Sequence, residues 1–163
     1  MRDAAARASW VAESRLHLTV KFLGEQPECE ADRLRETLRP VLARHPALSL
    51  AIGGLGAFPN LQSPRVVWMG VERDPRLELM HHDVESICGT LGHEVDGRAF
   101  RPHITLGRVR DRLAAPAARA LAGAARGVQF AGQVEMTSLD LMESQLVASG
   151  PRYRMVVALP LGG

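Results

Sequence analysis

The sequence has few cysteines and no long hydrophobic run, and both absences restrict what the chain can be. The two cysteines, Cys29 and Cys88, form no CxxC pair and have no metal-ligand spacing, so we expect incidental or buried thiols rather than a metal site or disulfide. The apolar stretches are too short to span a bilayer. The N-terminal "MRDAAARASW" has no apolar segment typical of a signal peptide. These features indicate a soluble, cytoplasmic protein.

The chain also lacks a strong charge of either sign. Its 163 residues suit one domain, and a net charge of +2 gives no general attraction for nucleic acid. Basic residues do gather locally near the middle of the chain, as either a solvated basic face or a surface for a phosphate-bearing ligand. This arginine cluster comprises Arg98, Arg101, Arg108, Arg110 and Arg112.

Several common catalytic signatures are missing. No P-loop, dinucleotide fingerprint, serine nucleophile elbow or HExxH sequence is found. The glycine cluster at 53–56 is better explained as a strand irregularity than as a phosphate-binding loop. The chemistry must therefore come from another pattern.

Hydrophobic periodicity predicts an α+β fold with antiparallel sheet, because strands and helices mix without regular βαβ alternation. Asp74 is expected to cap the clearest helix, with Pro75 in its first turn and Gly92 just beyond its end. A helical or loop lead-in is expected at 3–13, and a turn at 149–152. We predict helices at 28–44, 75–91 and 111–125, and strands at 16–23, 47–56, 65–72, 93–96, 99–107, 128–136, 138–143 and 153–159.

One four-residue phrase occurs twice. "HLTV" begins at His17 and "HITL" begins at His103, 86 residues later. Since residues i and i+2 of a strand share a face, each copy presents an imidazole and a hydroxyl on one face and two apolar side chains on the other. By the same alternation, Phe22 would pack in the core.

The paired histidines suit acid–base chemistry. One imidazole can accept a proton from a nucleophile while the other donates a proton to a leaving group. The hydroxyls of Thr19 and Thr105 can donate to a non-bridging phosphate oxygen, and Lys21 adds positive charge on the face of His17. A metal site is the alternative, but two histidines are too few ligands and no carboxylate has a suitable spacing. The remaining four histidines carry little weight.

With these motifs, the chain resembles the 2H phosphoesterase superfamily, and in particular the RNA 2′,3′-cyclic phosphodiesterases, also called 2′-5′ RNA ligases. The similar stretches run from about Trp10 to Leu161 and are "LHLTVKFLGE" (16–25), "GLGAFPNLQSPRVVWMGV" (54–71), "FRPHITLGRVR" (100–110) and "LDLMESQLVASGPRYRMV" (139–156). The resemblance implies a bilobal, pseudo-duplicated fold in which two antiparallel sheets with outer helices flank a central groove. Each lobe would contribute one motif.

The resemblance also implies roles for individual residues. His17 and His103 would be the catalytic pair, and Thr19, Thr105 and Arg108 would bind phosphate. Strict alternation puts Arg108 on the core face, so we expect Gly107 to end or bulge the strand. Phe58 and Tyr153 match family aromatics and are candidates for base stacking.

Residues 1–163 are expected to form a single domain that lacks the family's first strand and most of its first helix. We expect a monomer, with self-association through an uncovered sheet edge as the alternative. The implied function is metal-independent hydrolysis, without a cofactor, of 2′,3′-cyclic phosphates on RNA ends or nucleotides to 2′-phosphates, reversible as RNA ligation. The alternatives are an RNA-binding module without turnover and an enzyme for another cyclic or 2′-5′ phosphodiester.

Overall fold

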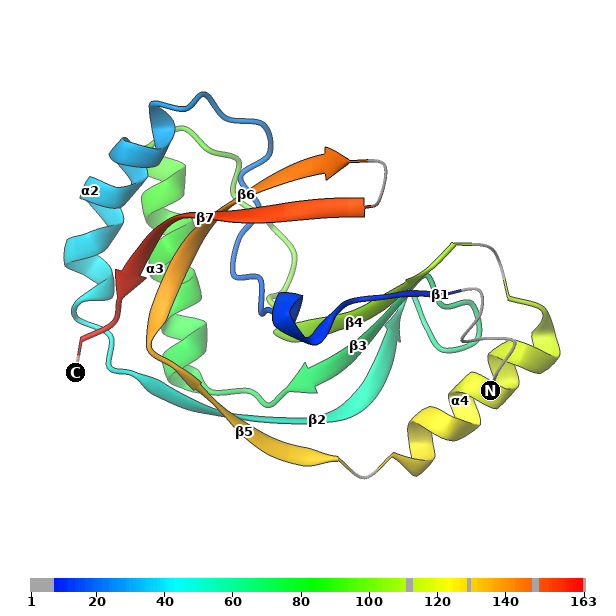
Figure 1. The fold of residues 1–163 in the computed structure, drawn as a ribbon. Coiled ribbons are helices and arrows are strands. Elements are labelled where there is room, and N and C mark those ends of the chain that lie inside the picture. Colours follow the sequence, from blue (N-terminus) through cyan, green and yellow to red (C-terminus); the bar gives the residue numbers. More distant parts are fainter. Residues whose placement is uncertain (1–7, 111–112, 129, 148–149, 163) are drawn as a thin grey trace. The chain divides into compact units, whose positions relative to one another are not determined.

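The computed structural model describes residues 8–110, 113–128, 130–147 and 150–162 (Figure 1). The chain forms two compact units. Unit 1 comprises Met1–Thr19, Leu50–Glu72 and Arg101–Val134. Unit 2 comprises Val20–Ser49, Arg73–Phe100 and Glu135–Gly163. Each unit is assembled from three separate segments, and we describe each by itself.

Unit 1 is built on a five-stranded sheet in the order β1-β4-β3-β2-β5. The pairs β1–β4, β4–β3 and β3–β2 are antiparallel. Helix α4 (Ala115–Gly127) packs through Ala118 against Leu113 and Val109, so it covers the face of β4 to which Val109 points. The strands are β1 (Ala8–Trp10), β2 (Leu48–Phe58), β3 (Val66–Val71), β4 (His103–Val109) and β5 (Ala131–Met136), with a short helix, η1 (Glu13–Arg15), after β1. The first two residues of β2 and the last two of β5 belong to unit 2.

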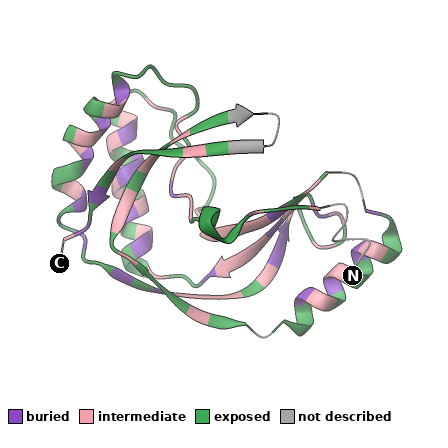
Figure 2. Cartoon of the chain, viewed as in Figure 1, coloured by how far each residue is buried: buried purple, intermediate pink, exposed green. Residues whose placement is uncertain are grey.

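Unit 2 consists of two helices and a two-stranded antiparallel sheet. The helices are α2 (Glu30–Leu42) and α3 (Pro75–Thr90), and the strands are β6 (Ser138–Val147) and β7 (Gly150–Pro160). Buried residues recur along both helices (Figure 2). The most completely buried side chains of this unit are Leu34, Leu42, Leu48, Leu77, Met80, Cys88 and Leu159. No helix within the described residues is long and apolar enough to cross a membrane.

The structure confirms the α+β class, the antiparallel pairing and the three predicted helices. Asp74 caps α3 as predicted, since its carboxylate accepts a hydrogen bond from the Arg76 backbone amide at 2.8 Å. Gly92 follows α3 with a φ of 94°, a value that favours glycine. The strand predicted at 93–96 is wrong, because these residues form no strand. The predicted turn at 149–152 includes residue 149, which lies outside the described residues, and 150–152 belong to β7.

The strand predicted at 16–23 is also wrong. Only Leu18 makes a bridge, to Ile104, and the rest of the segment has no strand pairing. The alternating pattern misled because its two ends are not core: Leu16 is 40 % exposed and Phe22 is 81 % exposed. Burial begins at Val20, which is 8 % exposed.

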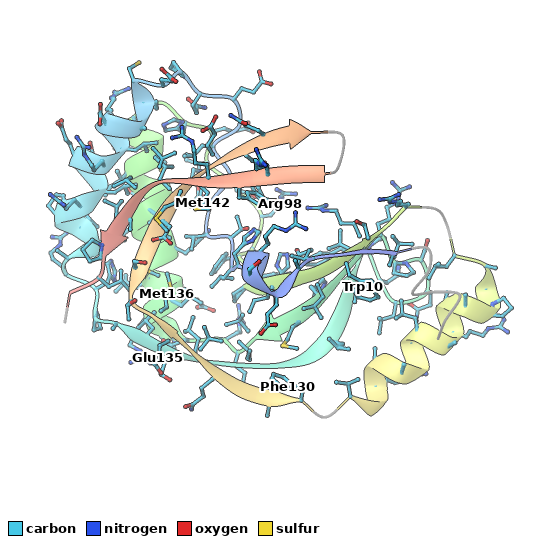
Figure 3. The ribbon with its side chains drawn as sticks, viewed as in Figure 1. Trp10, Arg98, Phe130, Glu135, Met136 and Met142 are labelled. Atoms are coloured by element: carbon cyan, nitrogen blue, oxygen red, sulfur yellow. The ribbon has the colours of Figure 1, made fainter. Side chains whose placement is uncertain are left out.

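The lead-in before the first motif differs from its prediction as well. It contains β1, which carries Trp10 (Figure 3) and pairs with the edge of β4. In this register Trp10 lies opposite Gly107. Gly107 permits this pairing because a Cβ there would lie 2.8 Å from the Trp10 ring. The edge of β4 beside the second motif is therefore covered by a short strand.

Candidate active site

Strand β4 positions the second motif. In the β3–β4 register, His103 lies opposite Gly70 and Thr105 lies opposite Trp68. His103 and Thr105 share one face of β4, and Ile104 points to the other. We call the face that carries His103 and Thr105 the motif face.

A single bridge brings the first motif beside the second. Leu18 pairs with Ile104 in an antiparallel sense. This bridge brings His17 and Thr19, which flank Leu18, beside the stretch of β4 that carries His103 and Thr105. Two imidazoles and two hydroxyls are therefore collected in unit 1.

The two histidines are oriented in the same way. In each, Nδ1 lies 2.8 Å from the carbonyl oxygen two residues earlier, that of Arg15 for His17 and of Arg101 for His103. A carbonyl only accepts hydrogen bonds, so Nδ1 is the donor in both rings. The neutral imidazoles then carry their lone pair on Nε2, which makes Nε2 the nitrogen that exchanges a proton with a substrate.

A bulge in β4 resolves the expected conflict at Arg108. Trp68 pairs with Thr105, but the preceding Val67 pairs with Gly107, so β4 has one extra residue between these pairs. Beyond the bulge, Val67 is buried with Gly107, whereas Arg108 is exposed. The bulge thus places Arg108 on the motif face. This agrees with the expectation that the strand would end or bulge at Gly107.

Aromatic rings surround His103. Phe58 meets its ring edge-on with centroids 5.0 Å apart, and Trp68 lies 6.1 Å from it. The Trp68 ring lies across Gly56, where a Cβ would overlap the indole. The buried Nε1 of Trp68 has no hydrogen-bond partner among the described residues, so packing rather than hydrogen bonding holds the ring. The sequence reasoning missed Trp68 and Gly56; their opposition across β2 and β3 is visible only in the strand register.

Lys21 is used differently from its prediction. Its ammonium donates to a carboxylate oxygen of Glu85 at 2.7 Å and to the Glu94 carbonyl at 2.8 Å, and its side chain is only 5 % exposed. The structure therefore makes Lys21 a buried ion-pair partner in unit 2, and we exclude it from the phosphate site. A buried carboxylate needs such a partner, whereas an open phosphate site needs an accessible cation.

The remaining predicted residues lie in different places. Tyr153 is on β7 of unit 2, opposite Ser144, and its stacking role stays a prediction. Arg98 is also in unit 2, where it donates to Asp96; its hydrogen bonds lower the pKa of that carboxyl well below the usual range. Arg112 lies outside the described residues. His17, Thr19, His103 and Thr105 belong to unit 1, whereas Val20, the last residue of the first motif, belongs to unit 2; one motif in each lobe stays a prediction.

The arrangement supplies the parts for acid–base chemistry on a phosphate ester. Two imidazoles present Nε2, two threonine hydroxyls can donate, and Arg108 brings a permanent positive charge to the same face. Among the described residues, no three histidine, cysteine or acidic side chains group in a way that could hold a metal ion.

Comparison with known proteins assigns the family. The model of the 2′-5′ RNA ligase superfamily matches residues 1–147. The chain belongs to this superfamily. It is similar to the RNA 2′,3′-cyclic phosphodiesterase of Geobacillus stearothermophilus (33 % identity over 155 residues, covering 95 % of this chain and 48 % of the relative). It is likewise similar to that of Aeropyrum pernix (34 % over 145 residues, covering 88 % and 81 %).

Solved structures of related proteins agree with the fold. TT0787 of Thermus thermophilus matches with a TM-score of 0.79 and 27 % identity, over 96 % of this chain and 84 % of the other. Escherichia coli LigT in apo form matches with a TM-score of 0.73 and 26 % identity, over 97 % and 82 %. LigT has also been solved in complex with 3′-AMP. This chain spans about half the length of the Geobacillus relative.

Proposed function

We propose that the protein hydrolyses 2′,3′-cyclic phosphates on RNA ends or nucleotides to 2′-phosphates, with His17 and His103 as its acid–base pair. The observation that carries this proposal is the Leu18–Ile104 bridge, which brings the segment of the first motif beside the strand of the second. The activity named for the relatives of Geobacillus and Aeropyrum supports the reaction class.

In the proposed reaction, one histidine accepts a proton from water through Nε2, and the water oxygen forms a bond to phosphorus. The bond between phosphorus and the ribose 3′-oxygen breaks, and the other histidine, present as the imidazolium with both ring nitrogens protonated, donates its Nε2 proton to that oxygen. Thr19, Thr105 and Arg108 stabilise the charge on the non-bridging oxygens. The same step with a 5′-hydroxyl in place of water forms a 2′-5′ phosphodiester and frees the 3′-hydroxyl, which is 2′-5′ ligation.

The test uses 2′,3′-cyclic AMP with EDTA present and identifies the product phosphate. His17→Ala and His103→Ala should each lower kcat by about 10²–10⁴-fold, the usual contribution of one positioned acid or base. Both variants should unfold at the wild-type denaturant concentration, because neither side chain is in the core.

Three outcomes would contradict the proposal in different ways. Binding of the nucleotide without turnover would indicate an RNA-binding module. Turnover of only other cyclic or 2′-5′ phosphodiesters would indicate a different substrate. Loss of wild-type activity in EDTA would overturn the metal-independent mechanism.

A further inference from the structure

One turn of α3 carries two polar side chains that bind the chain segments next to the histidine motifs. His81 and Glu85 are four residues apart on this helix, so their side chains lie on the same face. Both side chains are largely buried, and Nε2 of His81 lies 3.8 Å from a carboxylate oxygen of Glu85. Each of the two residues also contacts a different segment of the chain.

Glu85 holds the segment that follows the first motif. Its carboxylate accepts a hydrogen bond from the Lys21 ammonium at 2.7 Å and another from the Asp96 backbone amide at 3.2 Å. Lys21 lies four residues after His17. Residues 19–26 form neither helix nor strand, so no ladder of backbone hydrogen bonds fixes this stretch. Its place therefore depends on side-chain contacts such as the buried ion pair.

His81 holds the segment that precedes the second motif. Its ring stacks on that of Phe100, with centroids 3.9 Å apart and planes inclined by 12°. Burial lowers the pKa of His81, so the stacked ring is neutral at pH 7. Phe100 is followed by Arg101, whose carbonyl oxygen lies 2.8 Å from Nδ1 of His103. The stacked pair therefore fixes the residue next to the acceptor that orients this imidazole.

Both contacts lie where the chain passes from one unit to the other. Thr19 ends a segment of unit 1 and Val20 begins one of unit 2, whereas Phe100 ends a segment of unit 2 and Arg101 begins one of unit 1. The contacts of His81 are thus made inside unit 2 at the last residue before a passage, and those of Glu85 at the second residue after one. Only a few peptide bonds separate each contact from its motif.

We propose that His81 and Glu85 are positioning residues for the two motif histidines. Each acts through the segment that it holds: Glu85 acts through Lys21 on the first histidine, and His81 acts through Phe100 on the second. This inference rests on the proposed function, in which the two imidazoles are the acid–base pair. Positioning matters because a reacting group displaced by about 1 Å can lose about 10²-fold in rate.

The test removes each contact without leaving a buried charge unpaired. Lys21→Met is combined with Glu85→Gln, because either substitution alone would bury the remaining charge without its partner. His81→Ala removes the stacked ring, and His81→Phe keeps an aromatic ring in its place. With 2′,3′-cyclic AMP, the Lys21/Glu85 double variant and His81→Ala should each lower kcat by about 10–10²-fold and leave KM within about twofold. His81→Phe should recover most of kcat.

Combination with the motif variants distinguishes positioning from a general loss of structure. In the His17→Ala background, the Lys21/Glu85 double variant should cost no further kcat, because the group that it positions is absent. His81→Ala should still lower kcat in this background. The opposite pattern is expected in the His103→Ala background. Equal further losses in both backgrounds would overturn the proposal.

His82→Ala is the matched control for His81→Ala. His82 is the next residue on the same helix, and its side chain is exposed. The substitution removes the same ring from α3, so kcat and the urea midpoint of unfolding should keep their wild-type values. An equal loss of kcat in His82→Ala and His81→Ala would overturn the role of the stacked ring.

Imidazole NMR separates the inference from the proposed function, because it requires no turnover. The Hε1 signals of His17 and His103, assigned from their alanine variants, report the surroundings of each ring. The Lys21/Glu85 double variant should shift mainly the His17 signal, and His81→Ala mainly the His103 signal.

The two failures are then distinguishable. If 2′,3′-cyclic AMP is not hydrolysed, the proposed function fails, and these selective shifts would still support the positioning roles. If it is hydrolysed but kcat and both signals keep their wild-type values in the Lys21/Glu85 double variant and in His81→Ala, the inference fails and the proposed function stands.

Discussion

At the scale of single residues, the motif face depends on a glycine that has no chemistry of its own. Gly56 leaves the space in which the Trp68 indole lies, and Trp68 with Phe58 encloses His103. Because the indole N–H has no partner within the described residues, nothing but packing opposes a shift of this ring. Gly56 is therefore a positioning residue for the imidazole.

We expect Gly56→Ala to lower kcat by about 10–10²-fold with little change in KM, because displacing a reacting group by about 1 Å has effects of this order. Overpacking should also cost about 1–3 kcal/mol of unfolding free energy. Steady-state kinetics and urea unfolding measure both effects. Adding Trp68→Phe, which shortens the ring, should restore part of kcat.

Gly123→Ala is the control for this substitution. Gly123 lies in α4 of the same unit, and a Cβ there would meet nothing within 4 Å. It should leave kcat unchanged and stabilise the protein by about 0.5–1 kcal/mol. A well-folded Gly56→Ala variant with wild-type kcat would show that Trp68 does not position His103.

At the scale of secondary structure elements, the stability of the start of α3 depends on pH through its N-cap residue, Asp74. Hydrogen bonds from the Arg76 side chain and backbone lower the pKa of Asp74 to about 2. A carboxyl whose pKa is lower in the folded protein stabilises it above the unfolded value, about 4, and loses that contribution as the pH falls toward about 2.

Asp74→Ala should therefore reduce the unfolding free energy by about 1 kcal/mol at pH 7, the usual value of an N-cap. The difference from wild type should shrink between about pH 4 and pH 2. Asp74→Asn keeps a cap acceptor and should lose less at neutral pH. A deficit of Asp74→Ala that is the same at neutral and at acidic pH would argue against the charge of Asp74 as its cause. Urea unfolding at each pH makes the comparison.

The elements also show where sequence reasoning succeeds. Helix α3 was predicted because its cap, its first-turn proline and its apolar spacing all agree, and each is a local signal. The prediction of a strand at 16–23 was wrong although the segment alternates completely. A strand also needs a pairing partner, and that partner is far away in the sequence. The bulge near Gly107 could be anticipated only from the resemblance, which required Arg108 near the phosphate. Its location, between Thr105 and Gly107, came from the structure.

At the scale of the whole molecule, the resemblance predicted the family, the α+β class and a bilobal fold, but not which segments of the chain make up each unit. Clustering of the four motif residues in unit 1 could not be anticipated, because the two units interleave along the chain. The distribution of charge could not be anticipated for the same reason. The net charge of +2 is the sum of a basic unit 1 and an acidic unit 2. Lys21 shows the limit of strand parity, since the face of a residue does not reveal a partner 64 positions away.

Self-association is a property of the whole molecule that stays a prediction. The sheet of β6 and β7 has two strands, and Met142 and Met155, which face each other in its register, are 45 % and 54 % exposed. We expect a monomer at low concentration and reversible association as concentration rises, because unpaired strand edges favour pairing between chains. Met155→Lys should keep the protein monomeric in sedimentation velocity.

Leu79→Lys is the control, since Leu79 is 56 % exposed on α3 and lies on no strand edge. It should leave the association unchanged. A wild-type chain that stays monomeric at every concentration would remove the strand edges as a source of assembly.

Lys21 is the only lysine in the sequence, and its buried ammonium gives the protein an internal reporter. An amine-directed reagent can reach this nitrogen only when the contact with Glu85 opens, so acylation at Lys21 would record local opening of unit 2. Acylation would then remove the charge and leave Glu85 buried without its partner, which opposes reclosure. Arginine side chains do not react with the same reagent. Because the sequence has one lysine, acylation of a lysine side chain would report the opening of unit 2 alone.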